Sequence, residues 1–67
     1  MPAPIHDRHE RIMRVLVERR SPTIAEMVDD TGMSRSTCKR TLRELERDGR
    51  IRRHAVLGAA PVYVVTR

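Results

Sequence analysis

The stretch from Thr23 to Gly49, TIAEMVDDTGMSRSTCKRTLRELERDG, decides how this chain folds. Thr23 followed three residues later by Glu26 has the pattern of a capping box, in which each side chain bonds to a free backbone N–H of the other residue at a helix start. The apolar residues that follow recur at helical spacing until the next glycine. We therefore expect a short helix over 24–31.

The turn Thr31-Gly32-Met33-Ser34 leads from this helix into the next one. Gly32 can take the positive φ that lets a chain leave one helix and enter another within a few residues. Ser34 is placed to cap the following helix, and Gly49 is placed to end it. The sequence predicts this second helix over 35–48, at a fixed angle to the first.

The helix over 35–48 is expected to be basic on one side and apolar on the other. At about 100° per residue, one side spans an arc of about 140°. Its residues, five of them positively charged, are Arg35, Ser36, Lys39, Arg40, Arg43 and Arg47. The opposite side holds Cys38, Thr41, Leu42 and Leu45. A solvated helix usually alternates charges to form pairs four residues apart, so this arrangement favours an anionic partner.

Positive charge is concentrated in one third of the chain. The 67 residues include 14 Lys and Arg against nine Asp and Glu, for a net charge of +5. Residues 33–53 hold eight of the basic and three of the acidic side chains, which is the whole net charge. A basic patch of this kind is the electrostatic footprint of a protein that binds a phosphate backbone.

Length and composition predict a single domain over 1–67. One Tyr, no Phe and no Trp leave Ile, Leu, Val and Met to form the core. Cys38 is the single cysteine, so no internal disulfide is expected, and its place on the apolar side predicts a core residue and not a redox sensor. Without a membrane-spanning apolar run or a signal-peptide pattern, we expect a cytoplasmic protein with no membrane partner.

The segment before the two helices is expected to support them. Residues 1–6 contain two prolines and predict an irregular lead-in. A helix is expected over 7–20, beginning at an Asp7–Glu10 capping box and ending before Ser21-Pro22. Its apolar face comprises Ile12, Met13 and Leu16, with His9 extending it as a surface or partly buried residue.

The segment after them predicts a two-stranded hairpin over 51–66, because β-branched residues flank a loop containing Gly and Pro. Tyr63 and Val65 share the face expected to close over the helices. The loop Leu57–Pro61 contains no Arg or Lys.

Helix, helix, turn, helix and hairpin is the element order of a winged helix-turn-helix domain. From Glu10 onward the chain resembles winged-helix transcription regulators. The matching residues are Gly32, Met33, Ser34, Leu42, Leu45, Gly49 and Ile51, with Tyr63–Thr66 as the second wing strand. The resemblance implies an α+β fold, mainly α, with three helices and a C-terminal two-stranded β-hairpin wing.

The resemblance also implies sequence-specific binding to double-stranded DNA, by a small transcriptional regulator that occupies an operator and is nucleoid-associated when bound. Its third helix would enter the major groove, where arginine can bond to guanine O6 and N7. Arg47 would reach only the backbone. The residues expected to contact DNA are Thr23, Ser34, Arg35, Ser36, Thr37, Lys39, Arg40, Arg43, Arg47, Arg52 and Arg53. The apolar wing tip departs from many members, which have a basic residue there for the minor groove.

Two other functions stay open: an excisionase-like architectural DNA-binding protein of a mobile element, and a winged-helix module that contacts proteins. The second kind usually lacks a basic third helix. No enzyme, cofactor or metal site is expected, because no Gly-rich phosphate loop, activated nucleophile or second ligand cluster beside His6, His9 and Glu10 is present. No small-molecule effector is evident.

The oligomeric state is open among a monomer, a homodimer and two copies that meet on DNA. The candidate homodimer surfaces are Val15 and Val17, which flank the apolar face of the first helix, and Val62 and Val64, which face away from the core.

Overall fold

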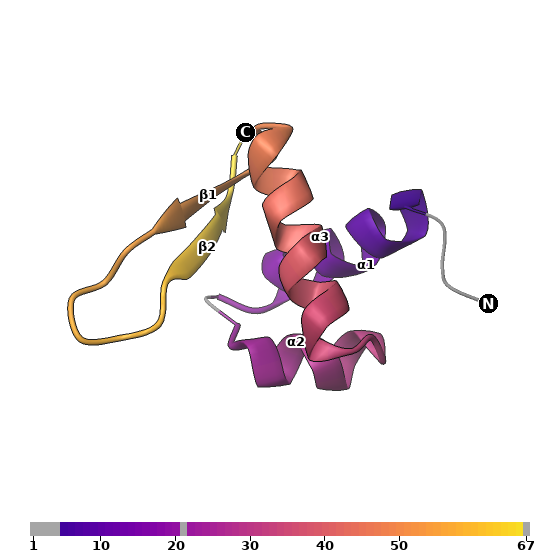
Figure 1. The fold of residues 1–67 in the computed structure, drawn as a ribbon, viewed down its shortest axis with the longest axis horizontal. Coiled ribbons are helices and arrows are strands. Elements are labelled where there is room, and N and C mark those ends of the chain that lie inside the picture. Colours follow the sequence, from indigo (N-terminus) through magenta and orange to yellow (C-terminus); the bar gives the residue numbers. More distant parts are fainter. Residues whose placement is uncertain (1–4, 21, 67) are drawn as a thin grey trace.

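The computed structural model describes residues 5–20 and 22–66, which form three helices and a two-stranded sheet (Figure 1). The elements are α1 (Ile5–Glu18), α2 (Ile24–Thr31), α3 (Arg35–Arg47), β1 (Ile51–His54) and β2 (Val62–Val65). The helices cross one another to form the body, and the hairpin extends from it as a wing. This is the α+β, mainly α architecture that the sequence predicts.

The bounds of α1 differ from those predicted. The helix begins at Ile5 and ends at Glu18, so the prediction of 7–20 is displaced by two residues at each end. Asp7 therefore lies in the first turn and does not cap the helix, and its carboxylate is 3.0 Å from Nε of Arg11, one turn later. The irregular lead-in predicted over 1–6 is wrong for residues 5 and 6, and residues 1–4 lie outside the described residues.

The side chain of Arg19, the first residue after α1, joins α1 to α2. Its Nε donates to Asp30 Oδ2 at 2.6 Å, and its Nη1 donates to Glu26 Oε2 at 2.5 Å. These bonds raise the pKa of Arg19, first through Asp30. The sequence did not predict these bonds, because the partners of Arg19, Glu26 and Asp30, lie on the next helix.

Helix α2 and the turn after it follow the predicted capping pattern. Thr23 Oγ1 accepts a hydrogen bond from Glu26 N at 3.1 Å, and Glu26 Oε1 accepts one from Thr23 N at 2.9 Å. Gly32 has φ 74°, and Ser34 Oγ accepts from Thr37 N at 3.1 Å at the start of α3. The direction of α3 is thus set by the left-handed conformation of Gly32 and by the side-chain cap of Ser34.

The end of α3 is a Schellman motif. Arg50 N donates to Leu45 O at 2.9 Å, and Gly49 N donates to Glu46 O at 3.0 Å, with Gly49 at φ 77°. The helix ends at Arg47, and Asp48, included in the predicted range, is its C-cap. The chain therefore turns directly from α3 into β1.

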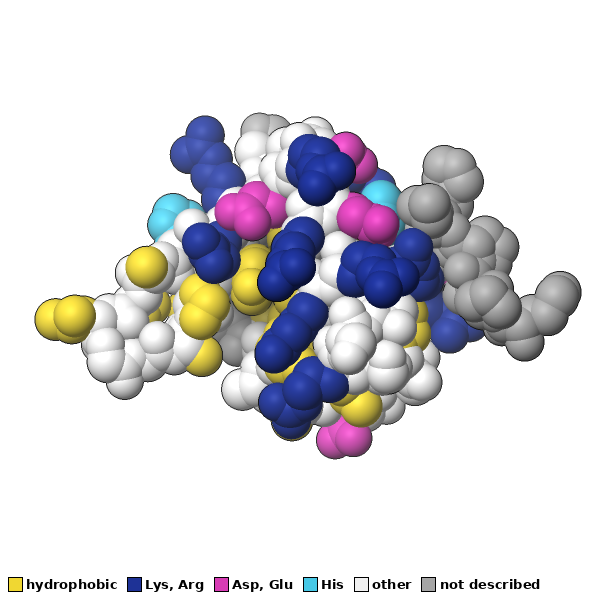
Figure 2. Space-filling view, viewed as in Figure 1, with side chains coloured by type: hydrophobic (Ala, Val, Ile, Leu, Met, Phe, Trp, Pro, Cys, Tyr) yellow, Lys and Arg dark blue, Asp and Glu magenta, His cyan; other side chains and the backbone are white. Residues whose placement is uncertain are grey.

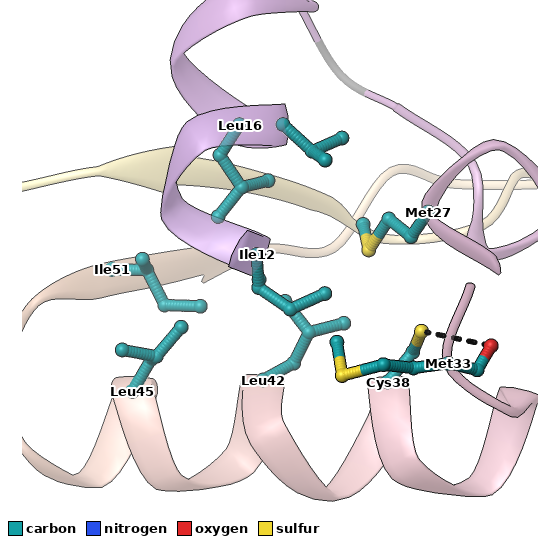
Figure 3. Packing of buried hydrophobic residues seen from close by; sticks show 9 residues of the cluster. Ile12, Leu16, Met27, Met33, Cys38, Leu42, Leu45 and Ile51 are labelled. Atoms are coloured by element: carbon teal, nitrogen blue, oxygen red, sulfur yellow. Dashed lines mark hydrogen bonds between the residues drawn. The ribbon is translucent and has the colours of Figure 1, made fainter. Parts of the chain in front are cut away.

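One hydrophobic core lies among the helices and the root of the wing (Figure 3). Its buried residues are Ile12, Val15, Leu16, Met27, Met33, Cys38, Leu42, Leu45 and Ile51. In Figure 3 the side chains of Leu42 and Leu45 point from α3 toward α1, and Ile51 from β1 closes the same space. Tyr63 and Val65 pack on this core from β2, as predicted.

Val15 is a core residue, which corrects its prediction as a candidate dimer surface. Its side chain is only 5% exposed. Helix α1 packs against α2, α3 and β2. Three neighbours bury a wider side of the helix than one neighbour would, and this side includes Val15. Val17 remains exposed, as predicted.

The wing is an antiparallel hairpin in which Ile51 pairs with Val65 and His54 pairs with Val62. Beyond these strands, Ala59 N donates to Val56 O at 3.0 Å and closes the tip as a four-residue turn. Gly58 occupies this turn with φ 76°. The strands are four residues long, so the wing depends on its root, where it touches the core.

Candidate nucleic-acid interface

The exposed side of α3 carries a continuous row of cationic side chains, which we call the α3 row. Its members, all exposed, are Arg35, Lys39, Arg40, Arg43 and Arg47. Figure 2 shows Lys and Arg side chains following the length of α3, with acidic side chains only to the sides. The opposite side of the helix is buried in the core. The fold therefore presents five positive charges on one rigid element.

The first turn of α3 adds hydroxyl groups beside the α3 row. Ser34 and Ser36 are exposed, and Thr37 is half-buried. Ser34 Oγ donates to Thr37 Oγ1 at 2.8 Å while it accepts from Thr37 N, so these two hydroxyls already serve the cap. Thr23 Oγ1 likewise serves the cap of α2. Of the hydroxyl residues predicted to contact DNA, Ser36 is not used in these capping bonds.

A groove of about 670 Å³ separates α3 from the wing. Its cationic lining residues are Arg35, Lys39 and Arg43 from α3 and Arg53 from β1. Its apolar lining residues include Ile24, Pro61, Val62 and Tyr63, and Thr23 lies at the start of α2 beside them. The groove thus brings together five of the residues predicted from the sequence, from three separate segments.

Arg52 and Arg53 were both predicted to contact DNA, but they lie on opposite faces of β1. Arg53 pairs with Tyr63 in the sheet register and lines the groove, whereas Arg52 pairs with Val64. Arg52 lines only a second hollow next to Gly49, which Arg53 also borders. Successive residues of a strand point to opposite faces, so this separation could have been predicted from the sequence.

A polar cluster behind the α3 row was not predicted. His9 is 8% exposed, and its Nε2 lies 3.0 Å from Glu44 Oε1. Nη1 of Arg8 is 3.6 Å from the same oxygen and donates to Thr41 Oγ1 at 3.2 Å. The hydrogen bond from His9, aided by the charge of Arg8, lowers the pKa of the Glu44 carboxyl. This acidic group of α3 is therefore neutralised by α1.

The helical spacing of His9 from Ile12 signals burial of the histidine, but nothing local identifies its partner, since Glu44 lies 35 residues later. Cys38 is buried as predicted, and burial raises the pKa of its thiol. Its Sγ lies 3.9 Å from Thr31 Oγ1 and 4.0 Å from Met33 O. It fills the space beneath the turn between α2 and α3.

Neither a metal centre nor a membrane span is found in the described part of the chain. Over residues 5–20 and 22–66, no three His, Cys, Asp or Glu side chains group as metal ligands would. Within the same ranges, no helix combines the length and the apolar character needed to cross a bilayer.

The order of elements, the capped turn and the exposed basic helix define a winged helix-turn-helix protein. Residues 5–52 match the model of the winged helix-turn-helix DNA-binding family, and the chain belongs to this family. Among solved structures it is similar to the peroxide stress regulator of Campylobacter jejuni, with a TM-score of 0.81 and 18% sequence identity. None of the curated proteins compared with the chain matches it.

The similarity to the Campylobacter regulator covers 94% of this chain and 50% of the other. The chain therefore spans about half the length of that protein. At this level of identity the likeness establishes the fold.

Proposed function

We propose that this protein is a small transcriptional regulator that binds double-stranded DNA with sequence preference and acts by occupying an operator. The observation that carries the proposal is the α3 row: five exposed cations, without an acidic residue among them, on a helix fixed by caps at both ends. A helix of this kind fits the major groove, and its cations neutralise phosphates. Membership of the DNA-binding family supports the same function.

Within this proposal, Arg40 and Arg43 read base edges near the middle of α3. A guanidinium can donate two parallel hydrogen bonds to O6 and N7 of guanine, which a lysine cannot match. Arg35 and Lys39, nearer the groove, contact phosphates or guanine, and Arg47, at the last turn, contacts only the phosphate backbone. These assignments follow from the position of each exposed side chain along the helix.

The remaining predicted residues are assigned to the phosphate backbone. Ser34, Ser36 and Thr37 surround the N-terminus of α3, where free backbone N–H groups and hydroxyls favour an anion. Thr23 and Arg53 line the groove between α3 and the wing, and we assign them to a DNA strand that passes between the two elements. Arg52 reaches phosphate only from the outer face of β1.

The cluster around Glu44 supports this function in a second way. A carboxylate on α3 would repel phosphate, but His9 and Arg8 hold its charge on the side that faces α1. This pairing concerns Glu44 alone, because Glu46, the other acidic residue of α3, is exposed and lines the groove beside the α3 row.

An architectural protein would use the same α3 row and differ in what it does to the duplex. For a homodimer, Val17 at 65% and Val64 at 47% exposure remain candidate surfaces, whereas Val62 is half-buried beside the groove. Protein contact alone gives no reason for a row of five exposed cations on one helix.

The test is selection of bound sequences from a random duplex pool. We expect enrichment of a motif, and two half-sites about one helical turn apart would indicate two copies on DNA. An Arg14→Ala variant removes one exposed arginine from α1, outside the α3 row, and should select the same motif. A folded protein that enriches no sequence would refute the proposed function.

A further inference from the structure

The tip of the wing is an exposed apolar point. Leu57 is the most exposed large hydrophobic side chain of the described residues, and Val56 beside it is also exposed. From Ala55 to Val65 the chain contains no charged residue. In a sequence that is 34% charged, this uncharged stretch distinguishes the wing from the rest of the surface. Within this stretch Tyr63 and Val65 pack on the core, but Val56 and Leu57 do not, so the core does not explain the apolar tip.

The backbone holds Leu57 outward. The hydrogen bond from Ala59 N to Val56 O closes a turn in which Leu57 is the second residue and Gly58, at φ 76°, is the third. A turn that needs a positive φ at its third position has the type II pattern, in which the second residue forms the corner. The leucine is thus presented by a defined turn, although its exposure to water is unfavourable.

The wing tip lies beside the proposed DNA-binding surface. The groove is bounded by the α3 row on one side and by Ala59, Ala60 and Pro61 of the tip on the other. In Figure 2 the apolar side chains of the wing lie to the left of the basic row on α3. A duplex that receives α3 in its major groove would present a phosphate ridge and then a minor groove to the tip.

The chemistry of the tip fits the minor groove better than the phosphate ridge. A tip without a cation gains nothing from phosphates. An apolar side chain can instead enter between base pairs from the minor groove, unstack them and kink the duplex. Gly58, Ala59 and Ala60 are small enough to allow close approach.

We propose that Leu57 is a minor-groove wedge that inserts between adjacent base pairs beside the site read by α3 and bends the DNA. The proposal rests on the proposed DNA-binding function and adds a DNA-contacting residue to it. Insertion buries the exposed leucine and draws the duplex toward Arg53 at the wing root. It also predicts a preference for a flexible step, TA or CA, at a fixed distance from the bases read by α3.

The test measures bending of a duplex taken from the selected pool, by energy transfer between dyes at its two ends. The parent protein should bend this duplex by tens of degrees, on the order of 20–90°. Leu57→Ala should leave the duplex nearly straight and weaken binding several-fold, while Leu57→Met should bend it as the parent does. Leu57→Lys should bind with a steeper salt dependence but without the bend, because a lysine contacts phosphate and does not wedge.

Unchanged thermal melting of the free variants would show that the fold is intact, as expected for a side chain outside the core. Bending by Leu57→Ala equal to that by the parent would overturn the wedge, as would a parent that selects a sequence yet leaves it straight. A dimer in the absence of DNA that is lost in Leu57→Ala would assign the tip to protein contact and also overturn it. Failure of the pool selection itself would instead overturn the proposed function, and the wedge with it.

Discussion

The turn between α2 and α3 and the turn at the wing tip each contain a glycine with a positive φ. The neighbours of the first glycine are buried, whereas those of the second are exposed. Gly32 has φ 74° and Gly58 has φ 76°. Around Gly32, Thr31 Oγ1 donates to Met27 O at 2.6 Å and accepts from Met33 N at 3.2 Å, all within buried residues. Around Gly58, a single backbone hydrogen bond closes a fully exposed turn.

This difference separates the part of the molecule that must be rigid from the part that can vary. A change near Gly32 alters the angle of α3, because the turn is packed against the core. A change near Gly58 alters only the tip, since the wing is attached through Ile51, Tyr63 and Val65 at its root. We therefore expect mutations in the two regions to affect different measurements.

The largest effect is expected from the double substitution of Arg40→Ala with Arg43→Ala. Each arginine proposed to read a base contributes about 1–3 kcal/mol, so their combined loss should lower affinity for the selected site by on the order of 100-fold or more. Both side chains are exposed, so the fold should be kept. Fluorescence anisotropy with selected and unrelated duplexes gives the affinities, and Arg14→Ala, which removes one charge outside the α3 row, is the control. If the double variant bound the selected site with the affinity of the parent, α3 would not be the element that recognises the DNA sequence.

Alanine at the two glycines compares the turns directly. In both positions the added Cβ meets nothing within 4 Å, so the change is one of backbone strain alone. Gly32→Ala should lower the free energy of unfolding by about 1 kcal/mol and the melting temperature by roughly 4–8 °C. Gly58→Ala should shift melting little, because the tip can open locally. Equal shifts in calorimetry would show that the wing tip folds as one unit with the core.

A smaller effect is expected at the wing strand. Arg53→Ala should weaken binding to all duplexes alike and reduce the salt slope by about 1, because the residue is assigned to a phosphate. Arg52→Ala, one residue away on the other face of β1, is the matched control and should change the slope less. Binding titrations at several salt concentrations give the salt slopes of both variants. Identical slopes for the parent and Arg53→Ala would exclude this side of the wing from the interface.

The smallest effect concerns pH. The pKa of folded Glu44 lies below its ordinary value of 4.5, chiefly because His9 donates a hydrogen bond to its carboxylate. Its contribution to stability is therefore fully present above pH 4.5 and is lost as the pH falls through the lower folded value. Denaturant unfolding at decreasing pH should show that Glu44→Gln loses less stability in acid than the parent does. The same loss in both proteins would mean that the cluster does not stabilise the ionised form.

The features that the sequence predicted correctly depend on residues close together in the chain. The capping box of α2 joins residues three positions apart, and the bounds of α2 coincide with the predicted 24–31. Gly32 and Gly49 both take the positive φ that ends a helix. The basic side of α3 followed from helical geometry alone.

The features that the sequence missed depend on contacts between separate elements. Val15 is buried because α1 is covered by more than one neighbour, which its own spacing does not show. The His9–Glu44 pair joins α1 to α3, and Arg19 joins the end of α1 to α2. The Asp7–Glu10 pattern predicted a cap that the earlier start of α1 overrides.

Tyr63 gives the protein a spectroscopic probe at one defined place. The chain has one tyrosine and no tryptophan, so its intrinsic emission comes from Tyr63 alone. This ring lies at the root of the wing, half-buried against the core and lining the groove beside α3. Quenching or polarisation of its fluorescence would therefore report the packing of the wing on the helices in solution. No label is needed, because the helices contain no tyrosine or tryptophan.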